Sequence, residues 1–296
     1  MTTRCGLVAL VGLPNAGKST LMNALMGEKV GIVSPKANTT RLVVRGIVAE
    51  GEAQLVLVDT PGLNSSAKAF DRLLVQQARG ALDDADVVCL VVDAARGLEP
   101  KVMDLIEGLK QARRPVVLVL NKVDLVQPRA KLLPLMQQAQ EIGIFKEVFA
   151  VDSLKEKGLQ EIIARLARLV PEGPWLFPAG MATDVPLPLR LAEITREKAM
   201  FYLQQEVPYG VAVLPVEITD VPDEPLVVVE RILVSAERYK GMVIGAGGQM
   251  LKKIGSAARQ DMQEVLGRGV RLELEVQVEE GWMEKMNLLR ELGVTL

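Results

Sequence analysis

A glycine-rich stretch near the start of this 296-residue sequence, Gly12-Leu-Pro-Asn-Ala-Gly-Lys-Ser19, has the residue types and spacing to bind phosphate. It fits the pattern G-x-x-x-x-G-K-S, in which backbone N–H groups converge on phosphate oxygens. In that pattern Lys18 reaches the β- and γ-phosphates of a nucleotide, and the Ser19 hydroxyl binds Mg²⁺. The alternative is a glycine turn beside a solvated lysine, and the neighbouring elements and motifs decide between the two.

The elements expected on either side supply the context that phosphate binding requires. A short apolar run at residues 7–11 is typical of a buried strand, and a helical run at residues 20–26 ends at Gly27. The N-terminus of that helix would point at the phosphates and add a favourable dipole. We therefore expect the phosphates to be bound by Gly12, Asn15, Ala16, Gly17, Lys18, Ser19 and Thr20.

A second motif, D-T-P-G, follows an apolar run at residues 54–58 and consists of Asp59, Thr60, Pro61 and Gly62. Asp59 is placed to hold Mg²⁺ through water, and the Gly62 N–H to contact a γ-phosphate. Alone the motif is an ordinary turn. Following a phosphate-binding loop in the same chain, it predicts a nucleoside triphosphate site.

A third motif, N-K-V-D, follows the apolar run at residues 116–120 and contributes Asn121, Lys122 and Asp124. A carboxylate accepts two hydrogen bonds, and guanine offers two donors on one edge, N1–H and the 2-amino group. Adenine lacks this donor pair, so a buried carboxylate left half-satisfied discriminates against it. The three motifs, in order and each after a strand, predict a GTP-binding domain.

The connector at residues 31–41 is expected to be a switch that closes onto Mg²⁺ and the γ-phosphate. Thr40 is the favoured ligand and Thr39 the alternative, although a threonine that merely enters a strand would look the same. With Ser19 and Asp59, Thr40 completes the expected magnesium site. A second switch is expected from Asp59 through residues 64–71.

Slow hydrolysis is expected from the residues near these switches. Leu63 stands where a water-orienting glutamine often follows D-x-x-G, and the sequence contains no histidine to replace it. This leaves Lys18, Thr40 and Gly62 as the catalytic groups, helped by a partner or by a monovalent cation such as K⁺. Asn15 is the candidate K⁺ ligand, and local hydrogen bonding within the loop is the alternative role for its side chain.

Composition limits the class of protein. Hydrophobic residues make up 49% and charged residues 24%, with a net charge of −2, so the chain can bury the cores of two domains. Cys5 and Cys89 lie in apolar runs without disulfide or metal spacing, which favours a reduced, cytoplasmic protein. The absence of histidine excludes Ser–His nucleophiles and His-ligated metals. No apolar run approaches the roughly 18 residues of a membrane span.

Alternating patterns predict an α/β fold for residues 1–172, with a mostly parallel sheet covered by helices on both faces. Further strands are expected at residues 42–49, 54–58, 87–92, 116–120 and 148–151, and helices at 70–82, 100–112, 131–142 and 159–169. Residues 173–183 are rich in proline and glycine, which indicates a linker between two domains.

Residues 184–296 predict a smaller α+β domain in the order helix–strand–strand–helix–helix–strand. The first helix is expected to pack with one face, and the last of three strands alternates apolar and polar residues. Pro215 makes the first strand, residues 211–218, an edge strand. The other strands are expected at residues 226–234 and 271–278, with helices at 251–266 and 282–292. The packing face of the first helix comprises Leu187, Leu191, Ile194 and Phe201.

A G-x-x-G sequence, residues 245–248, joins two of these helices, which is the mark of a KH domain, here of type II. In that domain the loop clamps about four single-stranded nucleotides. Residues 184–296 carry 13 Lys/Arg against 18 Asp/Glu, yet residues 231–259 carry six basic residues and one acidic residue. Positive charge therefore gathers around the loop. The expected RNA-binding residues are Lys240, Gly245, Ala246, Gly247, Gly248, Lys252 and Lys253.

The runs G-L-P-N-A-G-K-S-T, K-A-N-T-T-R, D-T-P-G-L and N-K-V-D, with R-E-K and E-V-P-Y before the KH order, resemble the Era family of ribosome-assembly GTPases. The resemblance covers nearly the whole chain. It implies a GTPase that binds GTP, GDP and Mg²⁺ and couples GTP binding and hydrolysis to binding of single-stranded RNA. The implied partners are the 3′ end of 16S ribosomal RNA and the small ribosomal subunit. A cytoplasmic monomer is implied, with peripheral association at the inner face of the cell membrane left open.

The sequence departs from the family pattern in two loops. The fifth guanine-contacting loop usually carries Ser-Ala, whereas this chain has Asp152 and Ser153 before Leu154. Ser153 and Leu154 are still expected at the base, and Asp152 adds a charge there. The family also tends to place basic residues in the middle of the G-x-x-G loop, where this chain has Ala246 and Gly247.

Two other functions are compatible with parts of the sequence. A GTP-dependent membrane or cell-cycle switch would use the C-terminal domain to bind protein or lipid, but no long amphipathic basic helix supports it. A phosphotransferase would use the phosphate loop on a small substrate, but N-K-V-D commits its contacts to a guanine base.

Overall fold

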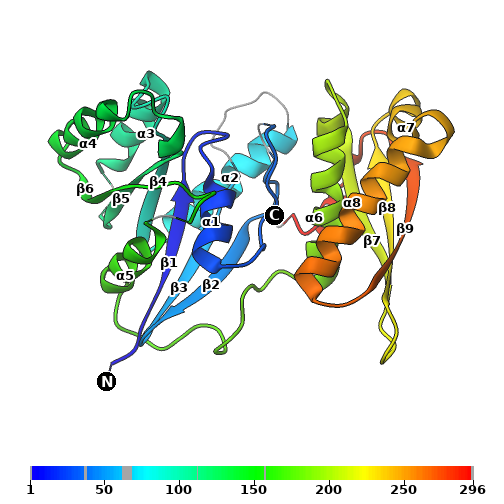
Figure 1. Cartoon of the computed structure of the whole chain (residues 1–296), viewed down its shortest axis with the longest axis horizontal. Helices are drawn as coiled ribbons and strands as arrows, with labels where there is room; N and C mark the ends of the chain where they lie inside the picture. The colour runs from blue at the N-terminus through cyan, green and yellow to red at the C-terminus, as the bar shows by residue number, and fades with distance from the viewer. Residues whose placement is uncertain (1, 37–38, 62–68, 112, 157, 295–296) are drawn as a thin grey trace. The chain divides into compact units, whose positions relative to one another are not determined.

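A computed structural model describes residues 2–36, 39–61, 69–111, 113–156 and 158–294. The chain divides into two compact units (Figure 1). The first comprises Met1–Gly31 and Thr40–Asp184, and the second comprises Ile32–Thr39 and Val185–Leu296. Gly62, Leu63 and most of the expected second switch lie outside the described residues.

The first unit is built on a six-stranded sheet in the order β2-β3-β1-β4-β5-β6. All neighbouring strands are parallel except the antiparallel pair of β2 and β3. The mostly parallel sheet predicted from sequence is therefore confirmed. The strands are β1 (Arg4–Val11), β2 (Val44–Glu50), β3 (Ala53–Asp59), β4 (Val87–Asp93), β5 (Val116–Asn121) and β6 (Phe145–Ala150).

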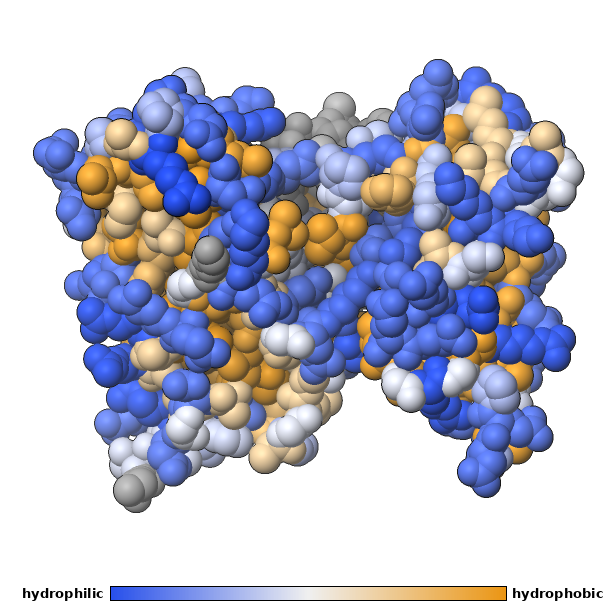
Figure 2. Space-filling view, in the orientation of Figure 1, coloured by the Kyte–Doolittle hydropathy of each residue, from blue (hydrophilic) through white to orange (hydrophobic). Residues whose placement is uncertain are grey.

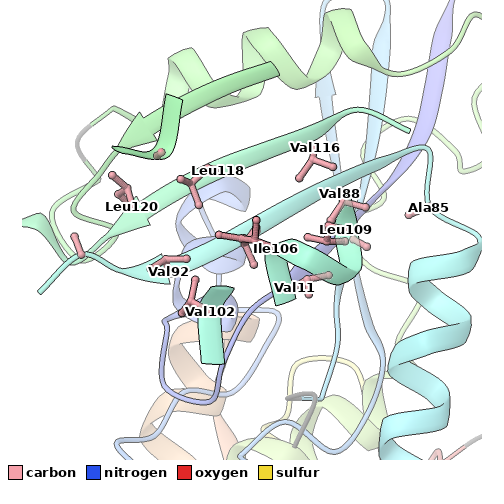
Figure 3. Packing of buried hydrophobic residues seen from close by; sticks show 14 of the residues in the cluster. Val11, Ala85, Val88, Val92, Val102, Ile106, Leu109, Val116, Leu118 and Leu120 are labelled. Atoms are coloured by element: carbon pink, nitrogen blue, oxygen red, sulfur yellow. The ribbon is translucent and has the colours of Figure 1, made fainter. Parts of the chain in front are cut away.

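Helices cover both faces of this sheet (Figure 1). On one face Val88 of β4 and Leu118 of β5 pack against Ile106 of α3, and all three are fully buried (Figure 3). Strands covered on both faces need apolar residues throughout, which explains their nearly continuous Val/Leu runs. The helices of this unit are α1 (Lys18–Met26), α2 (Ala69–Asp83), α3 (Pro100–Leu109), α4 (Leu132–Glu141) and α5 (Leu159–Leu169).

The segment expected to be a linker, residues 173–183, is fixed to β3 in the first unit. The side chain of Gln54, buried in β3, accepts hydrogen bonds from the backbone N–H groups of Leu176 and Phe177, both at 3.0 Å. Its amide nitrogen donates to the Phe177 carbonyl at 2.8 Å. Trp175 and Phe177 also pack against the buried Cys5 cluster.

The second unit has a three-stranded sheet in the order β7-β8-β9, with β7 antiparallel and β9 parallel to β8. Pro215 lies on the edge strand β7, as its missing N–H predicts. The expected final helix is divided into a 3₁₀ turn at Trp282–Glu284 and a short α9, because the buried Trp282 indole donates to the Gly210 carbonyl at 3.0 Å. The elements are α6 (Leu187–Tyr202), β7 (Val211–Thr219), β8 (Leu226–Val234), α7 (Glu237–Ile244), α8 (Gln249–Leu266), β9 (Val270–Val278) and α9 (Met286–Glu291).

The packing face predicted for α6 is only partly correct. Leu191 and Ile194 are buried, but Leu187, in the first turn, is 40% exposed and Phe201, in the last turn, is 58% exposed. The apolar stripe continues past the end of the core, so periodicity alone placed this ring wrongly.

A carboxyl group interrupts the core of the second unit. Glu230 of β8 is fully buried, between residues of two hydrophobic clusters that share α6, β8 and α8. Burial raises the pKa of Glu230 to about 7, a shift that the Thr195 hydroxyl opposes. The protonated, uncharged form is therefore favoured inside the fold.

Hydrophilic side chains cover most of the visible face of each unit (Figure 2). Among the described residues, no helix has the length and apolar character needed to cross a membrane. Both cysteines are buried and unpaired, and burial raises the pKa of Cys89 to about 12.

Candidate functional site

The phosphate-binding loop connects β1 to α1 and lies against the ends of β4 and β5. A Cβ atom on Gly12 would lie 2.2 Å from the Val91 carbonyl oxygen. Gly17 has a φ of 94°, and a Cβ there would lie 2.4 Å from Asn121 Nδ2. Both positions therefore require glycine, one for close approach and the other also for its left-handed backbone.

Lys18 begins α1, and its ammonium group bridges the loop. Its Nζ donates to the carbonyl oxygens of Gly12 at 3.2 Å and Leu13 at 3.4 Å. Burial lowers the pKa of Lys18, and the nearby charge of Asp59 opposes this shift. A buried cation whose hydrogen-bond partners among the described residues are carbonyl oxygens is suited to gain an anionic ligand, and phosphate is such a ligand.

Three side-chain oxygens meet beside the loop, from Ser19, Thr40 and Asp59. Ser19 Oγ lies 2.5 Å from Asp59 Oδ2 and 3.1 Å from Thr40 Oγ1, and the last two atoms are 3.4 Å apart. Burial raises the pKa of Asp59, while Lys18 and hydrogen bonds from Ser19 and Thr40 lower it. Asp59 Oδ1 is buried without a hydrogen-bond partner among the described residues.

This oxygen cluster fits a hard divalent cation, which prefers carboxylate and hydroxyl ligands. Thr39 lies elsewhere: its hydroxyl is 2.7 Å from Ser34 Oγ and donates to the Lys36 carbonyl at 2.8 Å. Of the two threonines weighed from sequence, the structure therefore brings Thr40 to Ser19 and Asp59. Thr60 is buried and donates to the Leu10 carbonyl at 3.1 Å, so its hydroxyl fixes the strand end.

The side chain of Asn121, at the end of β5, connects two loops through hydrogen bonds. Its Nδ2 donates to the Ala16 carbonyl at 3.1 Å, and its Oδ1 accepts from Ser153 Oγ at 2.8 Å and Ser153 N at 3.3 Å. Both hydrogen-bond donors of Ser153 are thus directed at Asn121. Leu154, the other residue of this loop that is expected at the base, is 80% exposed.

The two carboxylates near the expected guanine site, Asp152 and Asp124, differ in their partners. Asp152, the departure from the family pattern, is paired with Lys155 at 2.9 Å, and this hydrogen bond lowers the pKa of Asp152. The half-buried Asp124 carboxylate accepts no hydrogen bond from the part of the chain that the structure describes. Asp124 therefore retains both acceptor oxygens for a ligand.

Sequence reasoning missed two residues, Asp93 and Asn23, that fix backbone segments on either side of α1. Lys122 Nζ donates to the Asn15 carbonyl at 2.5 Å and to Asp93 Oδ2 at 2.8 Å, so Asp93 anchors the lysine over the loop. Asn23 of α1 accepts from the N–H groups of Val30 and Gly31, at 2.9 and 2.8 Å. Asp93 could have been found from the sequence, because it ends β4, a strand parallel to β5.

Part of the expected first switch (residues 31–41), namely the described residues 32–36 and Thr39, belongs to the second unit, where it contacts α6. Val33 N donates to Glu197 Oε2 at 2.9 Å. The Lys36 ammonium donates to the carbonyl oxygens of Met200 and Leu203. No motif in the sequence indicated these contacts, because they join residues about 160 positions apart.

The G-x-x-G loop joins α7 to α8 and contains a run of glycines with positive φ. Gly245, Gly247 and Gly248 have φ angles of 73°, 55° and 78°. A Cβ on Gly245 would lie 2.7 Å from Met250 Cβ, so the loop folds tightly onto the start of α8. Gly248 caps the N-terminus of α8, which leaves backbone N–H groups available to an anion.

An open groove of about 380 Å³ runs from this loop between α8 and β9. Its lining combines the apolar side chains of three leucines with the cations Lys252 and Arg259. The lining residues are Gly248, Leu251, Lys252, Gly255, Ser256, Arg259, Leu272 and Leu274. The sequence-predicted Lys240 is half-buried on α7, and Lys253 lies outside this lining.

Two family models match different parts of the chain. Residues 7–122 match the family model "50S ribosome-binding GTPase", and residues 206–283 match "KH domain". "GTPase Era" of Afipia carboxidovorans is 43% identical, covering 99% of this chain and 94% of the relative. "GTPase Era" of Caulobacter vibrioides is 39% identical, covering 99% of this chain and 96% of the relative.

Two solved structures are similar over the same length. A single-substitution variant of Aquifex aeolicus Era bound to GDP·AlF4⁻ is 39% identical with a TM-score of 0.93, covering 99% of this chain and all of that one. Era in complex with MgGDPNP and nucleotides 1506–1542 of 16S ribosomal RNA is 40% identical with a TM-score of 0.92 and the same coverage. From these relatives and from its own motifs, the chain belongs to the Era family of GTPases.

Proposed function

We propose that this chain uses GTP binding and hydrolysis in the first unit to control binding of single-stranded RNA by the second. The RNA is the 3′ end of 16S ribosomal RNA, and the process is assembly of the small ribosomal subunit. The observation that carries the proposal is the convergence of Ser19, Thr40 and Asp59 beside the phosphate loop, in a chain that also has the G-x-x-G groove. The solved relative with MgGDPNP and 16S ribosomal RNA supports the same pairing of ligands.

In the nucleotide site, each residue has a distinct task. Lys18 and the N–H groups of the loop bind the phosphates, while Ser19 and Thr40 hold Mg²⁺ with Asp59. Bound Mg²⁺ would bridge phosphate oxygens and neutralise the charge that develops on them. Asp124 selects guanine with its two acceptor oxygens.

Hydrolysis of GTP depends on groups that orient the attacking water, and the GTP motifs of this chain contain few such groups. Lys18, Thr40 and Gly62 are the proposed γ-phosphate contacts, and Gly62 lies outside the described residues. Leu63 has no polar atom with which to orient water. We therefore propose a slow intrinsic rate, increased by K⁺ held at Asn15, whose carbonyl already helps fix Lys122 above the loop.

In the RNA site, backbone groups replace the basic side chains that the loop lacks. The N–H groups at the start of α8 and the cations Lys252 and Arg259 contact phosphates, while the apolar side chains of Leu272 and Leu274 receive bases. The chain is proposed to act as a cytoplasmic monomer. Peripheral association with the inner face of the membrane is the alternative location.

The proposal is tested by crosslinking the full chain to RNA in cells and sequencing what it carries. Wild-type protein is expected to yield the 3′ end of 16S ribosomal RNA, and Gly248→Asp to lose it while purified protein keeps its GTP affinity. Unrelated RNA in the wild-type sample, or equal recovery by the variant, would overturn the RNA assignment. Recovery with liposomes instead of RNA would favour a membrane switch.

A further inference from the structure

An aromatic pair ends helix α6, with Phe201 exposed and Tyr202 half-buried. Phe201 is 58% exposed, and the two rings make a T-shaped contact at a centroid distance of 5.2 Å and an angle of 88°. The edge contact fixes the orientation of the Phe201 ring but leaves much of its surface in solvent. Single exposed apolar residues are common, so the ring alone indicates nothing.

A lysine next in sequence to a groove residue lies against this pair. Lys253 of α8 places its Nζ 4.4 Å from the centroid of the Tyr202 ring, a cation–π contact. Its neighbour Lys252 lines the groove. The start of α8 thus presents one lysine to the groove and the next to the aromatic pair, and α6 and α8 lie side by side in Figure 1.

The negative end of α6 is neutralised at the same place. A helix C-terminus carries a partial negative charge on its last carbonyl oxygens, which would repel a phosphate backbone. Here the Lys36 ammonium donates to the carbonyls of Met200 and Leu203, on either side of the aromatic pair. The nearby Glu206 carboxylate accepts a hydrogen bond from the Tyr239 hydroxyl at 3.4 Å.

We propose that Phe201 is a stacking platform for one unpaired RNA base, immediately beyond the nucleotides held in the groove. The RNA strand leaves the groove past Lys252, its phosphate passes Lys253, and the next base lies on the Phe201 ring. Stacking accepts any base, because every base has a π-face. The inference rests on the proposed RNA-binding function and extends its footprint from the groove to the end of α6.

RNA, rather than lipid or protein, is the proposed occupant for two reasons. Lys253 lies over the neighbouring Tyr202 ring, and Lys36 binds the carbonyl groups on either side of the aromatic pair, so the end of α6 carries positive charge that suits a phosphate backbone. A single phenylalanine supplies little apolar area for a membrane or a protein interface, whereas one ring is enough to stack one base.

The test compares binding of the full chain to a single-stranded RNA of about eight nucleotides, twice the length that the loop clamps. Phe201→Ala is expected to weaken binding about tenfold, Phe201→Leu to weaken it similarly, and Phe201→Trp to retain it, because only the aromatic ring can stack. An RNA of about four nucleotides should bind wild type and Phe201→Ala equally. An unchanged Tm shows that each exposed substitution preserves the fold.

A scan with single abasic nucleotides locates the stacked base. One abasic position should weaken binding to wild type as much as Phe201→Ala does, and should cause no further loss in that variant. Equal affinities of wild type and Phe201→Ala for the longer RNA would overturn the platform, as would a loss that is the same at every abasic position. Loss of flotation with anionic vesicles by Phe201→Ala, with RNA binding unchanged, would assign the ring to lipid instead.

Failure of the platform and failure of the RNA-binding function are separated by Gly248→Asp. If that variant binds the longer RNA like wild type, the groove assignment itself is wrong. If it loses binding while Phe201→Ala does not, the groove remains and only the platform is overturned.

Discussion

Arg196 donates a hydrogen bond from Nη2 to the main-chain carbonyl oxygen of Thr39 at 2.6 Å. The guanidinium is 1% exposed and also binds both carboxylate oxygens of Glu193, at 2.6 and 2.7 Å. A buried bidentate pair of this kind has a fixed geometry. Thr39 is therefore held from α6, and the next residue in the chain is Thr40, which lies beside Ser19.

Replacing Arg196 with methionine should release Thr39. The change keeps a long unbranched side chain but removes the guanidinium donor and leaves Glu193 without its partner. We therefore expect a loss of about 3 kcal/mol of unfolding free energy. Hydrogen exchange should become faster at residues 33–36, and GTP hydrolysis should slow. Urea unfolding, exchange mass spectrometry and a phosphate-release assay measure these effects.

Arg271→Met is the matched control, because Arg271 is an exposed residue of β9 paired only with Glu273 among the described residues. It should change stability by less than about 1 kcal/mol. Unaltered exchange at residues 33–36 in Arg196→Met would contradict the proposed hold on the switch.

Guanine selection should depend on the free acceptor oxygens of Asp124. Asp124→Asn replaces one acceptor with a donor, so we expect GTP affinity to fall by about 1–3 kcal/mol and xanthosine triphosphate to bind better. Titration with both nucleotides measures the change. Asp104→Asn, on the exposed part of α3, should leave both affinities unchanged, and equal GTP affinity in Asp124→Asn would exclude this role.

The hydrolysis rate should respond to the monovalent cation. Replacing Na⁺ with K⁺ is expected to increase phosphate release severalfold in wild-type protein, because the proposed site at Asn15 binds K⁺ in preference to Na⁺ and so holds a positive charge near the phosphates. Asn15→Ala should abolish the difference while binding GTP. Equal rates in the two salts would remove Asn15 from the mechanism and leave the nucleotide site intact.

RNA affinity should be more sensitive to charge than to bulk in the G-x-x-G loop. No atom lies within 4 Å of a Cβ placed on Gly248, whose φ is 78°. Asn and Asp both tolerate this backbone conformation, so Gly248→Asn should bind RNA weakly and Gly248→Asp not at all. Lys252→Ala should lower the salt slope of binding by about 0.7, measured by fluorescence anisotropy. Tight binding by Gly248→Asp would mean that the loop is only a turn.

The stability of the second unit should fall with rising pH because of Glu230. Its pKa is near 4.5 unfolded and about 7 folded, so between these values the folded state binds more protons. The unfolding free energy should therefore decrease as pH rises from 4.5 to 7, by up to about 3 kcal/mol. Glu230→Gln should remove this dependence and be more stable than wild type at pH 8.

Urea unfolding of both proteins between pH 5 and 8 isolates the contribution of Glu230, since other groups affect both alike. A difference between them that stays constant with pH would show that the carboxyl group is ionised in the folded protein throughout.

Local patterns predicted the elements well. Helix α5, Leu159–Leu169, and strand β8, Leu226–Val234, begin and end where their periodicity indicates. The phosphate loop and the G-x-x-G loop were also predictable, because each requires glycine at fixed spacing for a local reason. Backbone geometry and burial of nearby residues are encoded within a short window of sequence.

Contacts between distant residues were not predictable. The Arg196–Thr39 bond joins residues 157 positions apart, and each residue by itself resembles an ordinary helical arginine or loop threonine. For Phe201 the pattern predicted a contact that does not form. The residue belongs to the apolar stripe of α6, but no element among the described residues covers it. Which residues contact one another, and which helix faces are covered, depends on the assembled fold. Sequence periodicity carries no information about either.

The hold of Gln54 on Leu176 and Phe177 decides where the first unit could be separated from the second. A protein truncated after Glu172 would keep every GTP motif but would lose the strap that satisfies the Gln54 amide and covers Cys5. It would therefore expose apolar surface and leave the Gln54 side-chain amide with the Cys5 thiol, at 3.5 Å, as its remaining hydrogen-bond partner among the described residues. A cut after Asp184 retains the strap, so a stable GTP-binding fragment extends beyond Phe177, past the end of its last helix α5 at Leu169.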